Sequence, residues 1–204
     1  MTELDTRSRD ASPEVGAHRQ RLVDGMAAAL RERAYRDVTI GDIVRHARTS
    51  RRTFYEHFPS KQDCLIALLR DSHARLVGGI AAAVDPQAAW PVQIRQAIQA
   101  WIAGVQADPD VTLSWIRVVP SLGDDARDLS RATMDSFAQL IGSLSDTPEL
   151  RRAGITPPSR QETTILLGGL RELIATTVED GGDVGEIVDV ATEVTTRILV
   201  PQPR

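Results

Sequence analysis

Apolar residues recur at helical spacing in one segment after another along this chain, and residues 85–204 contain no alternating apolar and polar run of the kind that a strand shows. Capping residues, prolines and glycines separate the helical segments. We therefore expect an all-α protein of about nine helices, with a three-helix domain over residues 13–60 and a helical bundle over residues 61–204. The helices should begin near residues 13, 40, 51, 61, 91, 109, 124, 160 and 184.

Residues 39–58 carry the local signals of a helix-turn-helix. Thr39 and Asp42 are spaced as a capping box, so a first helix of about two turns begins here. A brief connection, Arg48-Thr49, follows it. A second helix should begin after Ser50, whose side chain can cap it.

The second helix of this motif has an apolar and a polar face. Phe54 and Phe58 fall on one face, where we expect both rings to pack inward. A further capping box, Ser60 with Asp63, begins the next helix, whose first turn brings Lys61 and free backbone amides to a place where a phosphate could sit. The polar face carries donors able to reach phosphates or base edges of DNA: Arg51, Arg52, Thr53, Tyr55 and His57.

Basic residues gather in this motif although the chain as a whole is acidic. Residues 45–61 hold five Lys and Arg residues against one acidic residue, whereas the whole chain has a net charge of −4. Only a docking surface has to neutralise phosphates, so the acidity of the remainder does not argue against DNA. A basic run can also be a solvated helix face, but its place on a capped helix-turn-helix favours DNA binding.

The run Phe54-Tyr55-Glu56-His57-Phe58-Pro59-Ser60-Lys61, preceded by Thr39-Ile40-x-Asp42-Ile43 and Ala47-x-x-Ser50-x-x-Thr53, resembles the N-terminal domain of the TetR family of transcriptional regulators. The resemblance covers about residues 16–76. Two positions depart from the family, which usually has Gly where Arg48 and Ala34 stand. At Arg48 the departure either reshapes the turn or holds a left-handed conformation at a cost of about 1 kcal/mol. The DNA-binding candidates are Thr39, Arg48, Thr49, Ser50, Arg51, Arg52, Thr53, Tyr55, His57 and Lys61.

The last two predicted helices are more apolar than one small core needs. The pair Gly168-Gly169 costs the first of them roughly 2 kcal/mol relative to alanines, a loss best explained if another backbone approaches closely there. Two such helices could pair with their copies in a four-helix interface, and the TetR resemblance likewise implies a homodimer built from the last two helices. An internal crossing within one subunit is the alternative. The interface candidates are Leu166, Gly168, Gly169, Leu170, Leu173, Ile187, Val188, Ala191 and Val194.

A ligand pocket is implied by the TetR resemblance rather than by any motif of its own. The pocket would lie among the fourth to eighth helices, within a domain for ligand binding and dimerisation. Large apolar residues at helical spacing are more often core than ligand contacts. Few charged residues fall on the inward stripes, which favours an apolar or aromatic effector. The candidates for the lining are His73, Trp101, Trp115, Met134 and Phe137.

Other features of the chain bear on its cellular location and on whether it is an enzyme. Residues 1–12 are polar and indicate a disordered arm rather than a signal peptide, and no stretch approaches the roughly 20 apolar residues that span a bilayer. We therefore expect a cytoplasmic protein with no membrane partner. Cys64, the only cysteine, should pack in the core. Without a thiolate cluster, a phosphate loop or paired His and carboxylate spacing, we expect no metal, no cofactor and no enzymatic activity.

These features predict a sequence-specific DNA-binding regulator. The most economical form is a repressor that leaves a palindromic double-stranded DNA operator when a small-molecule effector binds. The alternative is a helix-turn-helix activator or architectural DNA-binding protein that uses no small ligand. Ligand-dependent release from an operator would separate the two.

Overall fold

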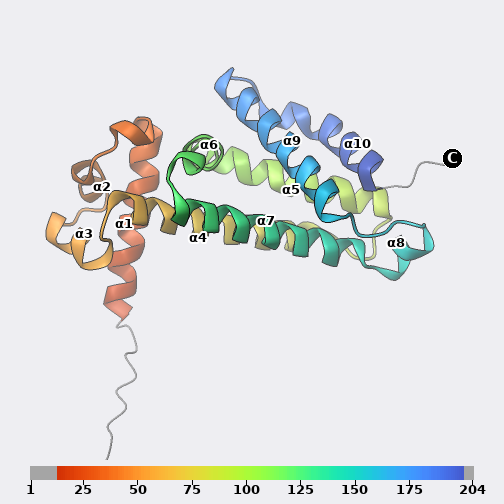
Figure 1. The fold of residues 1–204 in the computed structure, drawn as a ribbon, viewed down its shortest axis with the longest axis horizontal. Coiled ribbons are helices and arrows are strands. Elements are labelled where there is room, and N and C mark those ends of the chain that lie inside the picture. Colours follow the sequence, from red (N-terminus) through yellow and green to blue (C-terminus); the bar gives the residue numbers. More distant parts are fainter. Residues whose placement is uncertain (1–12, 200–204) are drawn as a thin grey trace, which may run out of the picture. The chain divides into compact units, whose positions relative to one another are not determined.

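The computed structural model describes residues 13–199, and every regular element in that range is helical (Figure 1). This confirms the expected all-α fold. The expected polar arm, residues 1–12, lies outside the described residues. The α-helices are α1 (Pro13–Glu32), α2 (Ile40–His46), α3 (Arg51–His57), α4 (Lys61–Ala83), α5 (Trp90–Ala107), α6 (Pro109–Leu113), α7 (Asp124–Ser145), α8 (Pro148–Arg152), α9 (Arg160–Glu179) and α10 (Val188–Leu199).

Shorter helical turns join several of these helices. They are the 3₁₀ turns η1 (Tyr35–Asp37), η3 (Val119–Ser121) and η4 (Val184–Ile187) and the π-helical turn η2 (Ser114–Val118). Across residues 13–199, no helix combines the length and the apolar character needed to cross a membrane.

The first compact unit ends at Leu68, inside α4. In it, α1 packs against α2 and α3 around fully buried side chains that include Leu22, Met26, Phe54 and Leu65. Gly25 permits the crossing of α1 and α2, because a Cβ atom there would lie 2.5 Å from the carbonyl oxygen of Ile43. Cys64 is buried in this unit, as the sequence predicts, and burial raises the pKa of its thiol to about 12.

The second compact unit begins at Leu69 and contains the remainder of α4 with the helices that follow it. Within this unit α10 packs against α5 and α9, and α9 packs against α7. The apolar stripes of α4, α5, α7, α9 and α10 therefore meet in one core, in which Ile80, Trp101, Phe137, Leu167 and Ala191 are buried.

Between α7 and α9 the structure has a helix in addition to those expected to begin near residues 124 and 160. A short helix, α8, forms because Thr147 caps it by accepting a hydrogen bond from the Leu150 amide at 3.2 Å. Leu150 and Ile155 are both buried, which anchors the segment. The last helix also begins later than the expected start near residue 184, because Asp183 accepts from the Gly185 amide at 2.7 Å and starts the 3₁₀ turn η4 first.

Candidate DNA-binding surface and ligand cavity

Side-chain caps fix both helices of the helix-turn-helix. The Asp42 amide donates to Thr39 Oγ1 at 3.2 Å and the Thr39 amide donates to Asp42 Oδ2 at 2.9 Å, which is the predicted capping box. Ser50 caps α3 by accepting from the Thr53 amide at 3.0 Å. The hydroxyl oxygens of Ser50 and Thr53 also lie 3.0 Å apart, and since only one of them donates to the other, one hydroxyl proton is left for an outside acceptor.

Arg48 lies in the turn between α2 and α3 with a φ of 50°. Within residues 13–199 it is the only residue other than glycine with a positive φ. The Thr49 amide donates to the Val44 carbonyl at 3.0 Å, which closes α2 in the pattern that commonly places Gly at the position of Arg48. Of the two expectations for this departure, the structure shows the left-handed conformation, and the arginine is retained at a cost of about 1 kcal/mol.

The helix α3 buries its aromatic face and exposes its polar face, as the sequence predicts. Phe54 and Phe58 are both buried. Arg52 has 90% of its side chain exposed and pairs with Glu56 one turn along at 3.2 Å, an exposed ion pair that contributes little to stability. The polar face consists of the exposed Arg51, Arg52 and Tyr55 and the half-buried Thr53 and His57.

Part of the basic charge in this motif is paired with carboxylates of the same unit. Arg45 donates to Glu32 Oε2 of α1 at 2.8 Å and lies 3.6 Å from Asp42 Oδ1. The hydrogen bond from Arg45 lowers the pKa of Glu32, so this pair stays charged at neutral pH. The cationic groups that remain for phosphates in the turn and α3 are therefore Arg48, Arg51 and Arg52.

Two of the predicted DNA contacts, Lys61 and Thr39, donate hydrogen bonds within the first unit. The Lys61 ammonium donates to the carbonyls of Tyr35 at 2.9 Å and Val38 at 2.7 Å, and it lies 4.3 Å from the centre of the Tyr35 ring. The Thr39 hydroxyl donates to Asp42 Oδ2 at 2.7 Å. Lys61 thus stabilises the turn η1 and Thr39 stabilises the start of α2, and contact of either residue with DNA stays a prediction.

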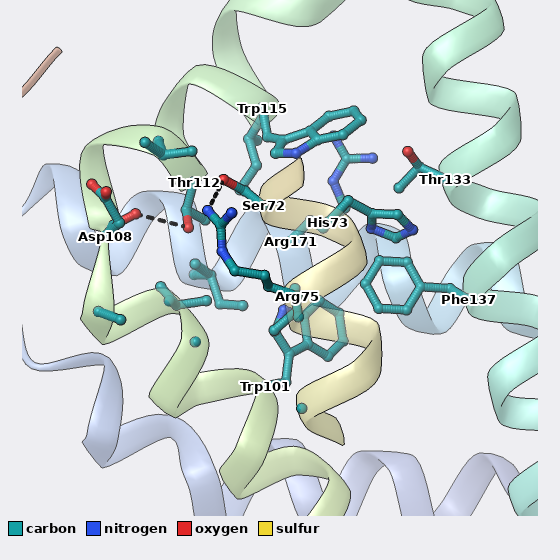
Figure 2. Close-up of a pocket in the computed structure, with 18 of the residues that line it drawn as sticks. Ser72, His73, Arg75, Trp101, Asp108, Thr112, Trp115, Thr133, Phe137 and Arg171 are labelled. Atoms are coloured by element: carbon teal, nitrogen blue, oxygen red, sulfur yellow. Dashed lines mark hydrogen bonds between the residues drawn. The ribbon is translucent and has the colours of Figure 1, made fainter. Parts of the chain in front are cut away.

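A cavity of about 570 Å³ lies within the second unit. The helices α4, α5, α6, α7 and α9 and the turn η2 all contribute to its lining, and Figure 2 shows the aromatic side chains that surround it. This volume is in the range of sites for drug-sized ligands. The structure brings all five sequence candidates to its wall, although their contact with a ligand stays a prediction: His73, Trp101, Trp115, Met134 and Phe137.

The cavity wall also holds polar side chains that the sequence did not single out. Arg171 of α9 lines the cavity and is half-buried, and this burial lowers the pKa of its guanidinium. Arg75 and Asp108 contribute charges of opposite sign, with Arg75 donating to the Ser72 hydroxyl at 3.1 Å. Sequence analysis missed Arg171 because an arginine on an amphipathic helix usually faces water. In the described part of the chain, no group of three or more His, Cys, Asp or Glu side chains is arranged to hold a metal ion.

Comparison with known families identifies the first unit. Residues 22–68 match the model of the bacterial regulatory proteins of the tetR family. Residues 22–68 belong to the TetR family. This confirms the resemblance found in the sequence, and the TetR segment spans the helix-turn-helix whose caps and exposed arginines are described above.

Solved structures extend the likeness beyond the TetR segment. The transcriptional regulator FadR from Bacillus subtilis, solved in complex with stearoyl-CoA, matches 88% of this chain and 97% of its own with a TM-score of 0.74 at 14% identity. The regulatory protein TetR from Rhodobacter sphaeroides matches 89% of this chain and 98% of its own with a TM-score of 0.70 at 18% identity. No curated protein sequence matches this chain. At these identities the likeness shows that this chain shares their fold.

The candidates for a dimer interface separate into buried and exposed residues. Leu166, Leu170, Ile187 and Ala191 are buried in the core of their own subunit, and their contact with a second copy stays a prediction. Leu173 and Val188 are partly buried against the same core. The exposed part of the face contains Gly168, Gly169 and Val194 together with two residues that sequence analysis left out, Ile165 and Val190.

Proposed function

We propose that this chain is a sequence-specific transcription regulator, most simply a repressor, that binds a palindromic operator as a homodimer and is released by a small effector. The observation that carries the proposal is the capped TetR-family helix-turn-helix, whose α3 exposes Arg51, Arg52 and Tyr55 while its own phenylalanines are buried. Helices presented in this way dock in the major groove of DNA.

The side chains on this surface suit two kinds of contact. Arg51 and Arg52 extend from the first turn of α3, and an arginine can bind a guanine edge through two parallel hydrogen bonds. Arg48, the hydroxyl pair of Ser50 and Thr53 and the phenol of Tyr55 suit phosphate oxygens, which fix the register of a protein on the duplex.

The effector site in this proposal is the cavity of the second unit. A ligand-free architectural protein has no use for a space of about 570 Å³ bordered by polar groups, so the cavity favours the ligand-responsive alternative. FadR from Bacillus subtilis was solved in complex with stearoyl-CoA, which supports ligand binding by a protein of this fold.

The exposed face of α9 and α10 is the proposed contact with a second copy of the chain. Ile165 is 68% exposed and Val190 and Val194 are 46% and 40% exposed, an unusual concentration of branched apolar side chains on a surface. A Cβ atom added at Gly168 or Gly169 would meet no atom of this chain within 4 Å, so the backbone is open to close approach by another helix. A two-fold dimer in turn requires a palindromic operator.

The test is binding of the purified protein to labelled duplex from the DNA flanking its gene, titrated with salt. Affinity should fall steeply as salt rises, because cations on the protein displace condensed counterions.

If an arginine binds a guanine, Arg51→Ala or Arg52→Ala should cost about 1 to 3 kcal/mol of binding free energy and relax preference at one base pair. If the arginine binds a phosphate, the slope of log affinity against log salt concentration should be smaller in magnitude by about 1. Arg127→Ala, a change at an exposed arginine of α7, is the matched control and should bind as wild type. Binding that is insensitive to salt, or equal in all of these proteins, would remove the DNA-binding assignment.

A further inference from the structure

On the cavity wall, one buried polar atom of α4 and one of α7 have no hydrogen-bond partner among the described residues. They are Nε2 of His73, on α4, and Oγ1 of Thr133, on α7, and both are fully buried as atoms. Buried polar atoms in folded proteins almost always have a partner, and leaving them without one is costly. Their position on one cavity suggests that a bound molecule supplies the missing partner.

Arg171 adds a positive charge to the same wall. It is half-buried and forms no hydrogen bond or ion pair in residues 13–199. The glutamate beside it, Glu172, is engaged by Arg117, which donates to both of its carboxylate oxygens and to both of those of Glu179. A half-buried guanidinium without a carboxylate partner is unfavourable unless an anion binds to it.

The charges around the cavity favour an anion at this place. The lining contains two arginines, Arg75 and Arg171, and one acidic residue, Asp108. Figure 2 shows Arg171, His73 and Thr133 in the same part of the view, whereas Asp108 lies well apart from Thr133. Burial lowers the pKa of His73, which keeps the imidazole neutral at pH 7 and able to donate from one ring nitrogen.

Aromatic rings form the wall next to these donors. The ring centroids of His73 and Phe137 lie 4.9 Å apart, those of Trp101 and Phe137 lie 5.4 Å apart, and those of His73 and Trp115 lie 6.2 Å apart. Such a wall contributes apolar contact area and flat surfaces for stacking. A smaller apolar cavity of about 90 Å³ shares Trp101 and Phe137 with the main one, which adds to the apolar surface on this side.

We propose that the cavity binds an aromatic monocarboxylate, with its carboxylate on Arg171, Thr133 and His73 and its ring system against Trp101, Trp115 and Phe137. A guanidinium, a hydroxyl and an imidazole N–H are matched donors for two carboxylate oxygens. A cationic ligand would place a second positive charge beside Arg171, and a neutral apolar one would leave all three donors unpaired. This proposal rests on the proposed function only in taking the cavity as the effector site.

The test compares two probes of the same shape, 2-naphthylacetate and its neutral amide, 2-naphthylacetamide, by calorimetric titration into wild-type protein without DNA. The carboxylate should bind at least about tenfold more tightly, because charge-assisted hydrogen bonds are the stronger kind. Arg171→Met should remove this preference by weakening the carboxylate while leaving the amide unchanged. Thr133→Val, which keeps the shape of the side chain, should weaken the carboxylate by a smaller factor.

Two controls separate binding from folding and from the function proposed above. Arg127→Met removes an exposed arginine of α7 outside the cavity lining and should keep the preference for the carboxylate. The thermal midpoint of Arg171→Met should equal or exceed that of wild type, because a half-buried charge is replaced by an apolar chain of similar length. Equal affinity for the two probes, absence of binding by both, or a preference that survives Arg171→Met would each overturn the proposal. If the same wild-type sample does not bind duplex DNA, that result would instead count against the proposed DNA-binding function.

Discussion

Gly25 lies where the backbones of α1 and α2 come closest in the DNA-binding domain. A Cβ atom at this position would be 2.5 Å from the Ile43 carbonyl oxygen and 3.1 Å from the Ala47 Cβ, and neither neighbour is the end of a flexible side chain. We expect Gly25→Ala to force α1 away from α2 and to destabilise the domain by about 1 to 3 kcal/mol or more. Thermal unfolding followed by circular dichroism would measure the loss.

The matched control for this change is Gly78→Ala on α4. A Cβ atom there meets nothing within 4 Å, so the substitution should only improve helix propensity and stabilise the protein by up to about 1 kcal/mol. If Gly25→Ala were as stable as wild type, the close crossing of α1 and α2 would not be a constraint on this domain.

Arg48 combines a local conformational cost with a charge on the proposed DNA-binding surface. Arg48→Gly should relieve the left-handed conformation, and Arg48→Ala should keep the strain while removing the same charge. We expect Arg48→Gly to be more stable than Arg48→Ala by up to about 1 kcal/mol in chemical denaturation. Both variants should bind duplex DNA more weakly than wild type, and the slope of log affinity against log salt concentration should be smaller in magnitude by about 1.

The prediction is tested by comparing the stability and the salt dependence of the two Arg48 variants. Equal stability would show that Arg48 is not strained. Wild-type salt dependence in both variants would show that the arginine does not neutralise a phosphate, and a different reason for its presence would be needed.

For single residues, the sequence correctly predicts interactions with partners that lie nearby in the chain. It does not predict interactions with partners that are distant in the chain. Thr39, Asp42 and Ser50 act as the caps that their spacing predicts, because a cap and its amide are three residues apart. The partners of Lys61 are the carbonyls of Tyr35 and Val38, which only the folded chain brings to its ammonium. The burial of Arg171 is likewise a product of packing, which helical periodicity alone does not predict.

Helix boundaries follow the same rule. The start of α9 at Arg160 agrees with the predicted helix start near residue 160, because Ser159 and Glu162 form a capping box there. The turn η2, by contrast, follows α6 as a separate π-helical turn, although the sequence predicts only one helix start, near residue 109, in this segment. The five candidates for the pocket lining do border one cavity, because inward stripes of neighbouring helices must meet: His73, Trp101, Trp115, Met134 and Phe137.

The two faces of α9 give a prediction for this helix as a unit. Leu170 is buried in the subunit core, so Leu170→Arg should leave an unpaired charge in it and unfold the second unit. Ile165 is 68% exposed, so Ile165→Arg should preserve the helix content and thermal transition of a folded chain. If the exposed face is the dimer contact, light scattering should then report monomers for Ile165→Arg and a dimer for wild type.

The control for this pair is Arg127→Ala, which changes an exposed side chain of α7 and should stay dimeric. A clean dimer in Ile165→Arg would place the dimer contact elsewhere. A folded Leu170→Arg would contradict the burial of Leu170, on which the division of α9 into two faces depends.

For the whole molecule, α4 is the element that both units share. The boundary between the units falls after Leu68, inside this helix, with Cys64 and Leu65 buried before it. Beyond the boundary, Ser72, His73 and Leu76 of the same helix line the cavity. A ligand that favours one position of α4 therefore acts on an element that continues without a break into the DNA-binding domain.

This continuity leads to a prediction about reciprocal binding. If 2-naphthylacetate weakens operator affinity a hundredfold, saturating operator must weaken its affinity for the protein a hundredfold as well, a coupling of about 2.7 kcal/mol. The emission of Trp101 and Trp115, both on the cavity wall, provides the binding signal with and without operator. Unrelated duplex at the same concentration and salt is the control and should change the affinity less. Equal affinities in free and operator-bound protein would mean that the cavity does not control DNA binding, and would favour a helix-turn-helix protein that acts without a ligand.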